Sequence, residues 1–477
     1  MARNRSGIRQ WLARATAPFS PWLSGVLGGY NILDPRRKVV QDADRRLFQA
    51  KTTANQLLNA GGTYLRNYCR ELERNNPTAR AAIDGAAALV VGTGISLEPD
   101  TGNEATDSII RREFNRIIAE IGVHGESIYE LQLQAFRELV CTGEGIWRIV
   151  PDGEDLKILP LDSEWIADDY GTTNDLTTVA GIKLDGYGRA IGYYLRNPER
   201  GVFSVADIEE VSARSMIHFF ERRRPVQHRG EPWLTPIIET LINERQLVDA
   251  ELKGAIITSA IGIAIESEVH GELESRGGED GDEDPTQAVG LGSIARLYPG
   301  EKIHSFGHTR PSQQIAPFRQ MLRGDIAAAM RLPQRFLDRD VSRANYSSMR
   351  ADMIDTERLL APVREWFGHE TIGRLYKLML PIMAARLGIA LPRSEYRLVP
   401  DVQPYVDPQK DIRAALDSIA GNLSTFEHEI GKRGEDYRQV WAQLAKEKQL
   451  LDDAGLSPKY GANAILEEPP VGREENS

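Results

Sequence analysis

The sequence of 477 residues contains only two cysteines, Cys69 and Cys141, which are too few for a disulfide framework or a cysteine-based zinc module. No run of about 18 apolar residues occurs, and this excludes an ordinary membrane-spanning helix. Basic residues are outnumbered, because 58 Lys and Arg face 69 Asp and Glu and leave a net charge of −11. This balance argues against a protein that coats nucleic acid nonspecifically, but it permits one through which DNA passes.

The motifs of common enzyme chemistry are also missing. There is no GxxxxGK[ST] phosphate loop, no GxSxG nucleophile elbow and no HExxH zinc motif. His304 and His308 are four residues apart without a third ligand nearby, so no metal is expected there. Cys141 ends an expected helix, where a buried structural thiol is favoured over a nucleophile. The sequence therefore predicts no cofactor, no metal and no catalytic residue, and it favours a protein that is not an enzyme.

Charge is distributed unevenly along the chain. Residues 1–80 hold 14 basic and 5 acidic side chains, and the segment 1–60 is predicted to be a basic arm, with a DNA or partner contact as the alternative to a solvated one. Residues 270–285 contain seven carboxylates and four glycines, which predicts a solvated loop. Pro285 stands where a calcium-binding EF-hand loop needs glycine, so calcium is not expected. The acidic tail 461–477 is predicted to be disordered.

The first half of the chain predicts helices followed by short strands. Asn76-Pro77 is a helix start signal, and helices are expected at about 70–91, 103–121 and 128–142. Short extended runs follow between residues 145 and 220, with turn residues of a hairpin around Asp185-Gly186. These patterns indicate an α+β region of about 220 residues.

The second half predicts two helices separated by a small β module. One helix is expected at about 235–261 and another at about 316–332, where Pro333 ends it. A polar stretch then precedes a long helix at about 345–387, with an expected kink near Pro362 or Pro381. Residues 407–456 are again helical in pattern.

Arginines recur at a spacing of four residues before the long helix, and other polar residues follow them. Arginine, asparagine, serine and backbone N–H groups are typical phosphate-contacting groups. The alternative is a solvated helix face that Asp338 and Asp340 balance, and Pro333 indicates that the arginines do not share one helix. The residues concerned are Arg331, Arg335, Arg339 and Arg343, spaced four apart, followed by Asn345, Tyr346, Ser347 and Ser348.

Six segments, in this order, resemble the lambda-type bacteriophage portal protein family. Each motif is weakly specific, but their common order over residues 60–460 makes the resemblance strong. The segments are RNNPTARAAIDGAAALVVGTGI at 74–95, DGYGR at 185–189 with MIHF at 216–219, RPVQHRGEP at 224–232, LYPGE at 297–301, DVSRANYSS with Arg350 at 340–350, and residues 406–436.

The resemblance implies an α+β portal fold assembled as a ring of about twelve subunits at one capsid vertex. The ring would be the channel for packaging and ejection of double-stranded DNA, recognised without regard to sequence. Its implied partners are the terminase large subunit, the head–tail connector, the major capsid protein and the scaffold protein. The resemblance implies that the protein is located in the virion, at a capsid vertex, and in the host cytoplasm during assembly.

The resemblance also implies a division of the subunit into wing, stem, clip and crown. Within the channel loop, Arg335, Arg339, Arg343, Asn345 and Tyr346 are expected to line the DNA channel. The implied map has a basic arm at 1–60, the wing at 61–232 and 349–405, stem helices at 233–262 and 315–333, the clip at 263–314, the channel loop at 334–348, the crown at 406–460 and the tail at 461–477.

Two other functions remain open on the sequence alone. One is a DNA packaging or processing enzyme, such as a nuclease or an ATPase, against which the missing phosphate loop weighs. The other is a capsid scaffold protein, against which the order helix, β module, helix, loop weighs.

Overall fold

The computed structural model describes residues 53–170, 177–196, 207–260, 264–267, 301–304, 314–340, 345–400, 408–431 and 437–455. Outside these residues lie the arm before residue 53, the acidic loop 270–285, Arg343, His308 and the tail 461–477. Helices and antiparallel sheets are both present, which is the expected α+β class. Within the described part of the chain, no helix is long and apolar enough to cross a membrane.

Two consecutive helices begin the described chain, α4 (Ala54–Asn75) and α5 (Pro77–Val90). Thr53 and Gln56 form a capping box at the start of α4. Asn76 then caps α5, as its sequence predicts, by accepting hydrogen bonds from the N–H groups of Thr78 and Ala79 at 2.9 and 3.1 Å. The expected arm 1–60 therefore ends too late, because residues 54–60 are the first turns of α4.

Three small antiparallel sheets follow from the next part of the chain. Helices α6 (Glu104–Ile118) and α7 (Ile128–Thr142) precede strands β2 (Glu144–Asp152) and β3 (Asp155–Leu161). Strand β8 (Met216–Phe220) completes the order β3-β2-β8, with Ile146 opposite both Leu161 and His218. The other sheets pair β1 (Ser96–Pro99) with β11 (Tyr396–Val399), and β4 (Thr178–Val179), β5 (Ile182–Leu184), β6 (Ala190–Leu195) and β7 (Glu209–Ser212) in chain order.

The main core joins the first helices to the last ones of the body. Phe367 lies with its ring centroid 5.1 Å from that of Phe136 in α7 and 5.6 Å from that of Phe219 in β8. Trp147 of β2 continues the chain of edge-to-face contacts through Phe219 at 5.6 Å. A second, smaller core lies around Ile146, Ile182 and Tyr193, between the two larger sheets.

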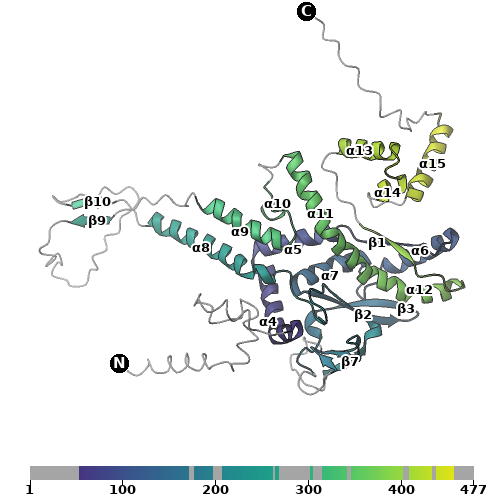
Figure 1. The fold of residues 1–477 in the computed structure, drawn as a ribbon, viewed down its shortest axis with the longest axis horizontal. Coiled ribbons are helices and arrows are strands. Elements are labelled where there is room, and N and C mark those ends of the chain that lie inside the picture. The colour runs from purple at the N-terminus through teal and green to yellow at the C-terminus, as the bar shows by residue number, and fades with distance from the viewer. Residues whose placement is uncertain are drawn as a thin grey trace, which may run out of the picture.

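A pair of helices projects from this body, with the small β9–β10 ribbon beyond their ends (Figure 1). Thr235–Ile237 forms one 3₁₀ turn, and α8 (Ile238–Ala260) continues from it. Strands β9 (Ala264–Ser267) and β10 (Glu301–His304) pair antiparallel, and α9 (Ile315–Ala329) returns alongside α8. Both helices and the β module between them were predicted from the sequence, within three residues at each helix end.

The long helix expected after the polar stretch is interrupted. It consists of α11 (Tyr346–Gly368), a π-helical segment at His369–Gly373, and α12 (Arg374–Leu387). The interruption lies between the two prolines rather than at either, at the place where β11 packs. A Cβ atom on Gly373 would lie 2.2 Å from the hydroxyl oxygen of Tyr396, so only glycine permits this approach.

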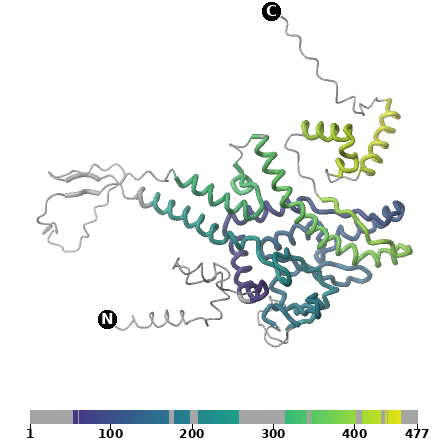
Figure 2. The backbone as a smooth tube through the Cα atoms, viewed as in Figure 1, coloured from purple at the N-terminus to yellow at the C-terminus, as the bar shows by residue number. Residues whose placement is uncertain are grey.

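Three helices end the described chain and stand apart from the body (Figure 2). They are α13 (Pro408–Ala420), α14 (Phe426–Gly431) and α15 (Tyr437–Asp453). The helical pattern expected for residues 407–456 is thereby confirmed for the described part of that segment.

Candidate functional site

The polar segment after α9 changes direction twice. Arg331 and Arg339 have left-handed φ angles of 60° and 51°, and the short helix α10 (Arg335–Asp338) lies between them. Left-handed backbone is uncommon for residues other than glycine. The Arg339 N–H donates to the Arg335 carbonyl at 2.7 Å and closes α10. The arginines therefore do not share one helix, as Pro333 predicts.

The three described arginines of the series have different surroundings. Arg331 donates to Glu221 at 2.7 Å, and its guanidinium lies 4.6 Å from the ring centroid of Trp233. The Arg335 side chain is only 16% exposed and lies 3.6 Å from Asp352 of α11. Arg339 is exposed. Of these three, Arg339 is therefore the side chain best placed to contact a ligand.

Asp338 does not balance the arginines of its own segment. It accepts hydrogen bonds from Arg323 of α9 and from Gln334, the latter at 3.1 Å. Arg323 also donates to Glu244 of α8 at 2.7 Å, and Arg319 donates to the same Glu244 oxygen at 2.8 Å. Burial alone would raise the pKa of Glu244, but the two arginines hold it below its ordinary value. These contacts join α8, α9 and α10 at the base of the helix pair.

Asn345 has a structural role in addition to any contact it makes. Its side-chain oxygen accepts from the Ser348 N–H at 2.9 Å, and the Ser348 hydroxyl accepts from the Asn345 N–H at 3.1 Å. This reciprocal pair is the capping box of α11. Tyr346 is the first residue of that helix. The described backbone thus places both predicted residues at the start of α11, while Arg343 lies outside the described residues.

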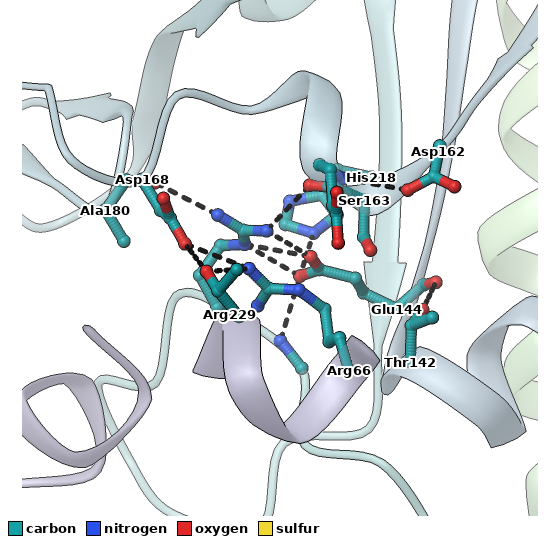
Figure 3. A network of polar contacts seen from close by, with 12 residues as sticks. Arg66, Thr142, Glu144, Asp162, Ser163, Asp168, Ala180, His218 and Arg229 are labelled. Carbon is teal, nitrogen blue, oxygen red and sulfur yellow. Dashed lines mark hydrogen bonds and ion pairs between the residues drawn. The ribbon is translucent and has the colours of Figure 1, made fainter. Parts of the chain in front are cut away.

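The RPVQHRGEP motif at 224–232 is anchored by a fully buried carboxylate, that of Glu144 (Figure 3). Glu144, at the start of β2, accepts from the Arg229 Nε–H with both oxygens at 2.9 Å and from Nη2–H at 2.5 Å. It also accepts from the Gly230 N–H at 3.0 Å, and His218 of β8 lies with Nε2 3.1 Å away. Arg229 further donates to the carbonyls of Ala180 and Ser163.

The ionisation of this network follows from its burial. Burial alone would raise the pKa of Glu144, but Arg229 and the hydrogen bond from His218 hold it well below its usual range. Burial lowers the pKa of His218 despite the neighbouring carboxylate. Arg66 of α4 lies beside Arg229 and pairs with Asp168 at 2.9 Å. The network therefore contains an ionised Glu144 paired with Arg229 and a neutral His218.

The loop before Arg229 is held by two side-chain amides. Gln227 accepts from the N–H groups of Arg223 and Arg224 and donates to the Arg229 carbonyl at 2.8 Å. Asn55 of α4 donates to the Val226 carbonyl at 2.8 Å and accepts from the His228 N–H at 3.1 Å. Because Trp233 follows four residues after Arg229 and α8 begins at Ile238, this network fixes the root of the projecting helix pair to the body.

Reasoning from the sequence missed Glu144, Arg66 and Asn55, and it gave His218 no role although the segment 216–219 was recognised. The motif 224–232 was also recognised, but Glu144, Arg66 and Asn55 lie far from it along the chain and show no spacing that points to them. Within the described residues, no group of three His, Cys, Asp or Glu could hold a metal ion. Cys69 and Cys141 are buried free thiols, and burial raises the pKa of Cys69 to about 12.

Comparisons with known proteins give the chain's family. A family model described as "Phage portal protein, lambda family" matches residues 42–364, more than half of the chain. The portal protein of Escherichia phage N15 is 24% identical over 326 residues, which cover 60% of this chain and 62% of that protein. Portal protein B of Escherichia phage lambda is 24% identical over 328 residues, covering 60% and 61%. The matched part thus spans about three fifths of the length of these relatives.

Solved structures show a weaker likeness. A chain of the "Virion of native gene transfer agent (GTA) particle" is 15% identical with a TM-score of 0.47, covering 83% of this chain and 94% of that one. An HK97-family phage portal protein from Corynebacterium diphtheriae is 15% identical with a TM-score of 0.34, covering 73% and 97%. The family model, which spans both the helix pair and the polar segment, decides the assignment: the chain belongs to the lambda family of phage portal proteins.

Proposed function

We propose that this chain assembles into a ring of about twelve subunits at one capsid vertex, through which double-stranded DNA is packaged and ejected. The observation that carries the proposal is the family match over residues 42–364, which includes the projecting helix pair and the segment with Arg339. The ring would be a structural conduit without catalysis of its own. It would dock the terminase large subunit and the head–tail connector, and contact capsid and scaffold proteins. It would assemble in the host cytoplasm and remain in the virion.

In this proposal the body is the wing, and the helices α8 and α9 are the stem. The β9–β10 ribbon belongs to the clip, the segment 334–348 is the channel loop, and α13–α15 form the crown. The ion pairs of Glu244 with Arg319 and Arg323 support the pairing of the stem helices. The Arg323–Asp338 pair supports a channel loop that is held to the stem.

The charge of the chain suits a channel in which DNA slides. Each basic side chain that neutralises a phosphate releases counterions and adds affinity. A subunit with a net charge of −11 gives a ring that is acidic overall and adheres weakly to DNA. A few exposed arginines at one level, Arg339 among them, would still contact the phosphate backbone without reading its sequence.

We expect reversal of charge in the channel loop to impair DNA packaging. The variant Arg339→Glu/Arg343→Glu should lower the DNase-protected DNA per head about three- to tenfold, because it replaces phosphate contacts by repulsion. Arg335 is left in place because its pair with Asp352 would confound the result. The matched control is Arg112→Glu/Arg393→Glu, two exposed arginines of the wing. Unchanged packaging and retention in the channel variant would remove these arginines from the channel.

The stem carries apolar side chains that the subunit itself does not cover. Leu252 and Ile256 of α8 are each 59% exposed, and Phe318 and Met321 of α9 are 48% and 54% exposed. A groove of about 550 Å³ runs between the two helices, lined by both apolar and charged side chains. Exposed apolar surface of this extent is typical of protein interfaces. It supports a stem that packs sideways against the stems of neighbouring subunits.

Native mass measures this assembly directly. Twelve copies of the 53.2 kDa chain give a species near 640 kDa, and we expect Leu252→Glu/Ile256→Glu to shift most of it to the monomer. The control Gln246→Glu/Ala250→Glu places the same charges on another exposed side of α8 and should retain the ring. A wild-type chain that stays monomeric at high concentration with scaffold added would contradict the ring. ATP turnover by the purified chain would instead support the alternative that the protein is a DNA packaging enzyme.

A further inference from the structure

The crown helices have no core of their own. No described residue of 408–431 or 437–455 is buried, although these residues form α13, α14 and α15. In contrast, α12, the last helix before the crown, buries six side chains over its 14 residues. Short helices in water are marginal unless they bury an apolar face. The crown therefore lacks, within one subunit, the packing that ordinarily holds helices in place.

The crown nevertheless has the sequence pattern of a packed unit. The apolar side chains of α13 and the turn after it, and those of α15, recur at helical spacing along one side of each helix. Leu423 is 86% exposed and Trp441 is 49% exposed. The ring of Trp441 lies 6.0 Å from that of Phe426, which joins α14 to α15, and 5.3 Å from that of Tyr437 within α15. The two stripes are Ile412, Leu416, Ile419 and Leu423, and Tyr437, Val440, Trp441, Leu444 and Leu451.

The body of the same subunit does not bury the residues of these stripes. Ion pairs on the surface join the crown to the body, namely Arg438–Glu104, Arg397–Glu427 at 2.8 Å and Arg350–Asp411 at 3.6 Å. Exposed ion pairs contribute little and bury no apolar surface. Figures 1 and 2 both show the three helices beside the body rather than packed into it.

We propose that the crown obtains its core from the next subunit, with the α13 stripe of one copy covering the α15 stripe of its neighbour. The inference rests on the proposed ring. A closed ring repeats one head-to-tail contact, and that contact needs two different complementary surfaces on each subunit. The two stripes meet this requirement, because they lie on different helices and no residue of either stripe is buried within its own chain. Crown folding and ring closure are then one event.

The charge of the crown favours a second copy of this chain over DNA or the N-terminal arm as the partner that covers the stripes. Residues 408–455 hold seven basic and nine acidic side chains, so a polyanion such as DNA would gain nothing by covering them. Residues 1–52 hold ten basic and three acidic side chains, and α4, which follows them in the sequence, lies on the side of the body away from the crown (Figure 1). A surface of mixed charge around an apolar stripe can complement an identical unit, with its opposite charges paired at the rim.

Hydrogen exchange of the full-length protein tests the inference. Monomer and ring fractions are separated by size, and peptides from 408–455 are followed by mass spectrometry. We expect exchange near the unfolded rate in the monomer and at least about tenfold slower exchange in the ring. Peptides from α5 and α7, which are buried within one subunit, should be protected in both fractions.

Two variants of α15 make the test specific. Leu444→Glu/Leu451→Glu should leave the crown unprotected, or prevent closure of the ring, whereas Ala442→Glu/Gln449→Glu on the opposite side should behave as the wild type. Equal protection in monomer and ring would show that the chain covers its own stripes and would overturn the inference. A ring whose crown stays unprotected would overturn it while leaving the portal proposal standing. Failure of the wild type to form any ring would overturn both.

Discussion

Replacing Glu144 with alanine is expected to lower the free energy of unfolding of the wing by about 3 to 5 kcal/mol. Glu144 is completely buried and is the counter-ion of Arg229, whose side chain is only 2% exposed. The substitution would leave a buried guanidinium without its partner and the Gly230 N–H without its acceptor. Both losses act in the same direction, because neither group can reach water without opening the wing.

Urea denaturation of the monomeric chain, followed by circular dichroism, measures this effect. The control is Glu209→Ala, which removes the partner of Arg148 in the same wing. The Glu209 side chain is 57% exposed, so its loss should cost less than about 1 kcal/mol. Equal effects of the two substitutions would show that the Glu144 network does not hold the wing together.

A buried ion pair is weak evidence for net stability, because well-packed apolar residues often do as well. What the Glu144–Arg229 pair adds is a fixed geometry. It brings β2, β8, the loop at Ala180 and the motif before the stem to one point. Directed hydrogen bonds of this kind fix the path of the chain from the body into α8 more narrowly than apolar packing would.

The elements that the sequence predicts well have their signals close by. Helix α7 lies at Ile128–Thr142, as expected, because Ser127 and Glu130 form a capping box at its start and Gly143 adopts φ 96° at its end. The stem helices were located in the same way, by their apolar spacing and by Pro333. In each case the stabilising contact lies within a few residues of the element that it bounds.

The elements that were missed depend on distant partners. Helix α4 contains Gly61 and Gly62, which disfavour a helix in isolation, and it forms because Leu58, Leu65 and Cys69 are buried in the core. The same holds for Glu144 and Arg229, which are 85 residues apart. Nothing in the spacing of the four arginines distinguishes the paired Arg331 from the exposed Arg339. Family resemblance singled out the segment 334–348, and only the fold separates the surroundings of its side chains.

Replacing Gly230 with alanine is expected to destabilise the wing by about 3 kcal/mol or more. Two chain segments cross here, since the end of α7 meets the motif before the stem. A Cβ atom on Gly230 would lie 1.9 Å from the Gly143 carbonyl oxygen and 2.3 Å from its carbon. Both are backbone atoms, so the overlap is relieved only by separating the segments. That separation would also break the hydrogen bond from the Gly230 N–H to Glu144.

The control is Gly186→Ala in the β5–β6 hairpin, where a Cβ atom would meet nothing within 4 Å and the φ angle is not left-handed. Alanine restricts the unfolded chain equally at both positions, which by itself stabilises by about 0.4 to 1 kcal/mol. The difference between the two variants therefore isolates the crossing of the segments at Gly143 and Gly230. Should Gly230→Ala be too unstable for denaturation, the yield of soluble protein relative to Gly186→Ala replaces it as the measure. Equal stability of the two variants would mean that the segments do not approach so closely, and the motif would then lose its role as the anchor of the stem.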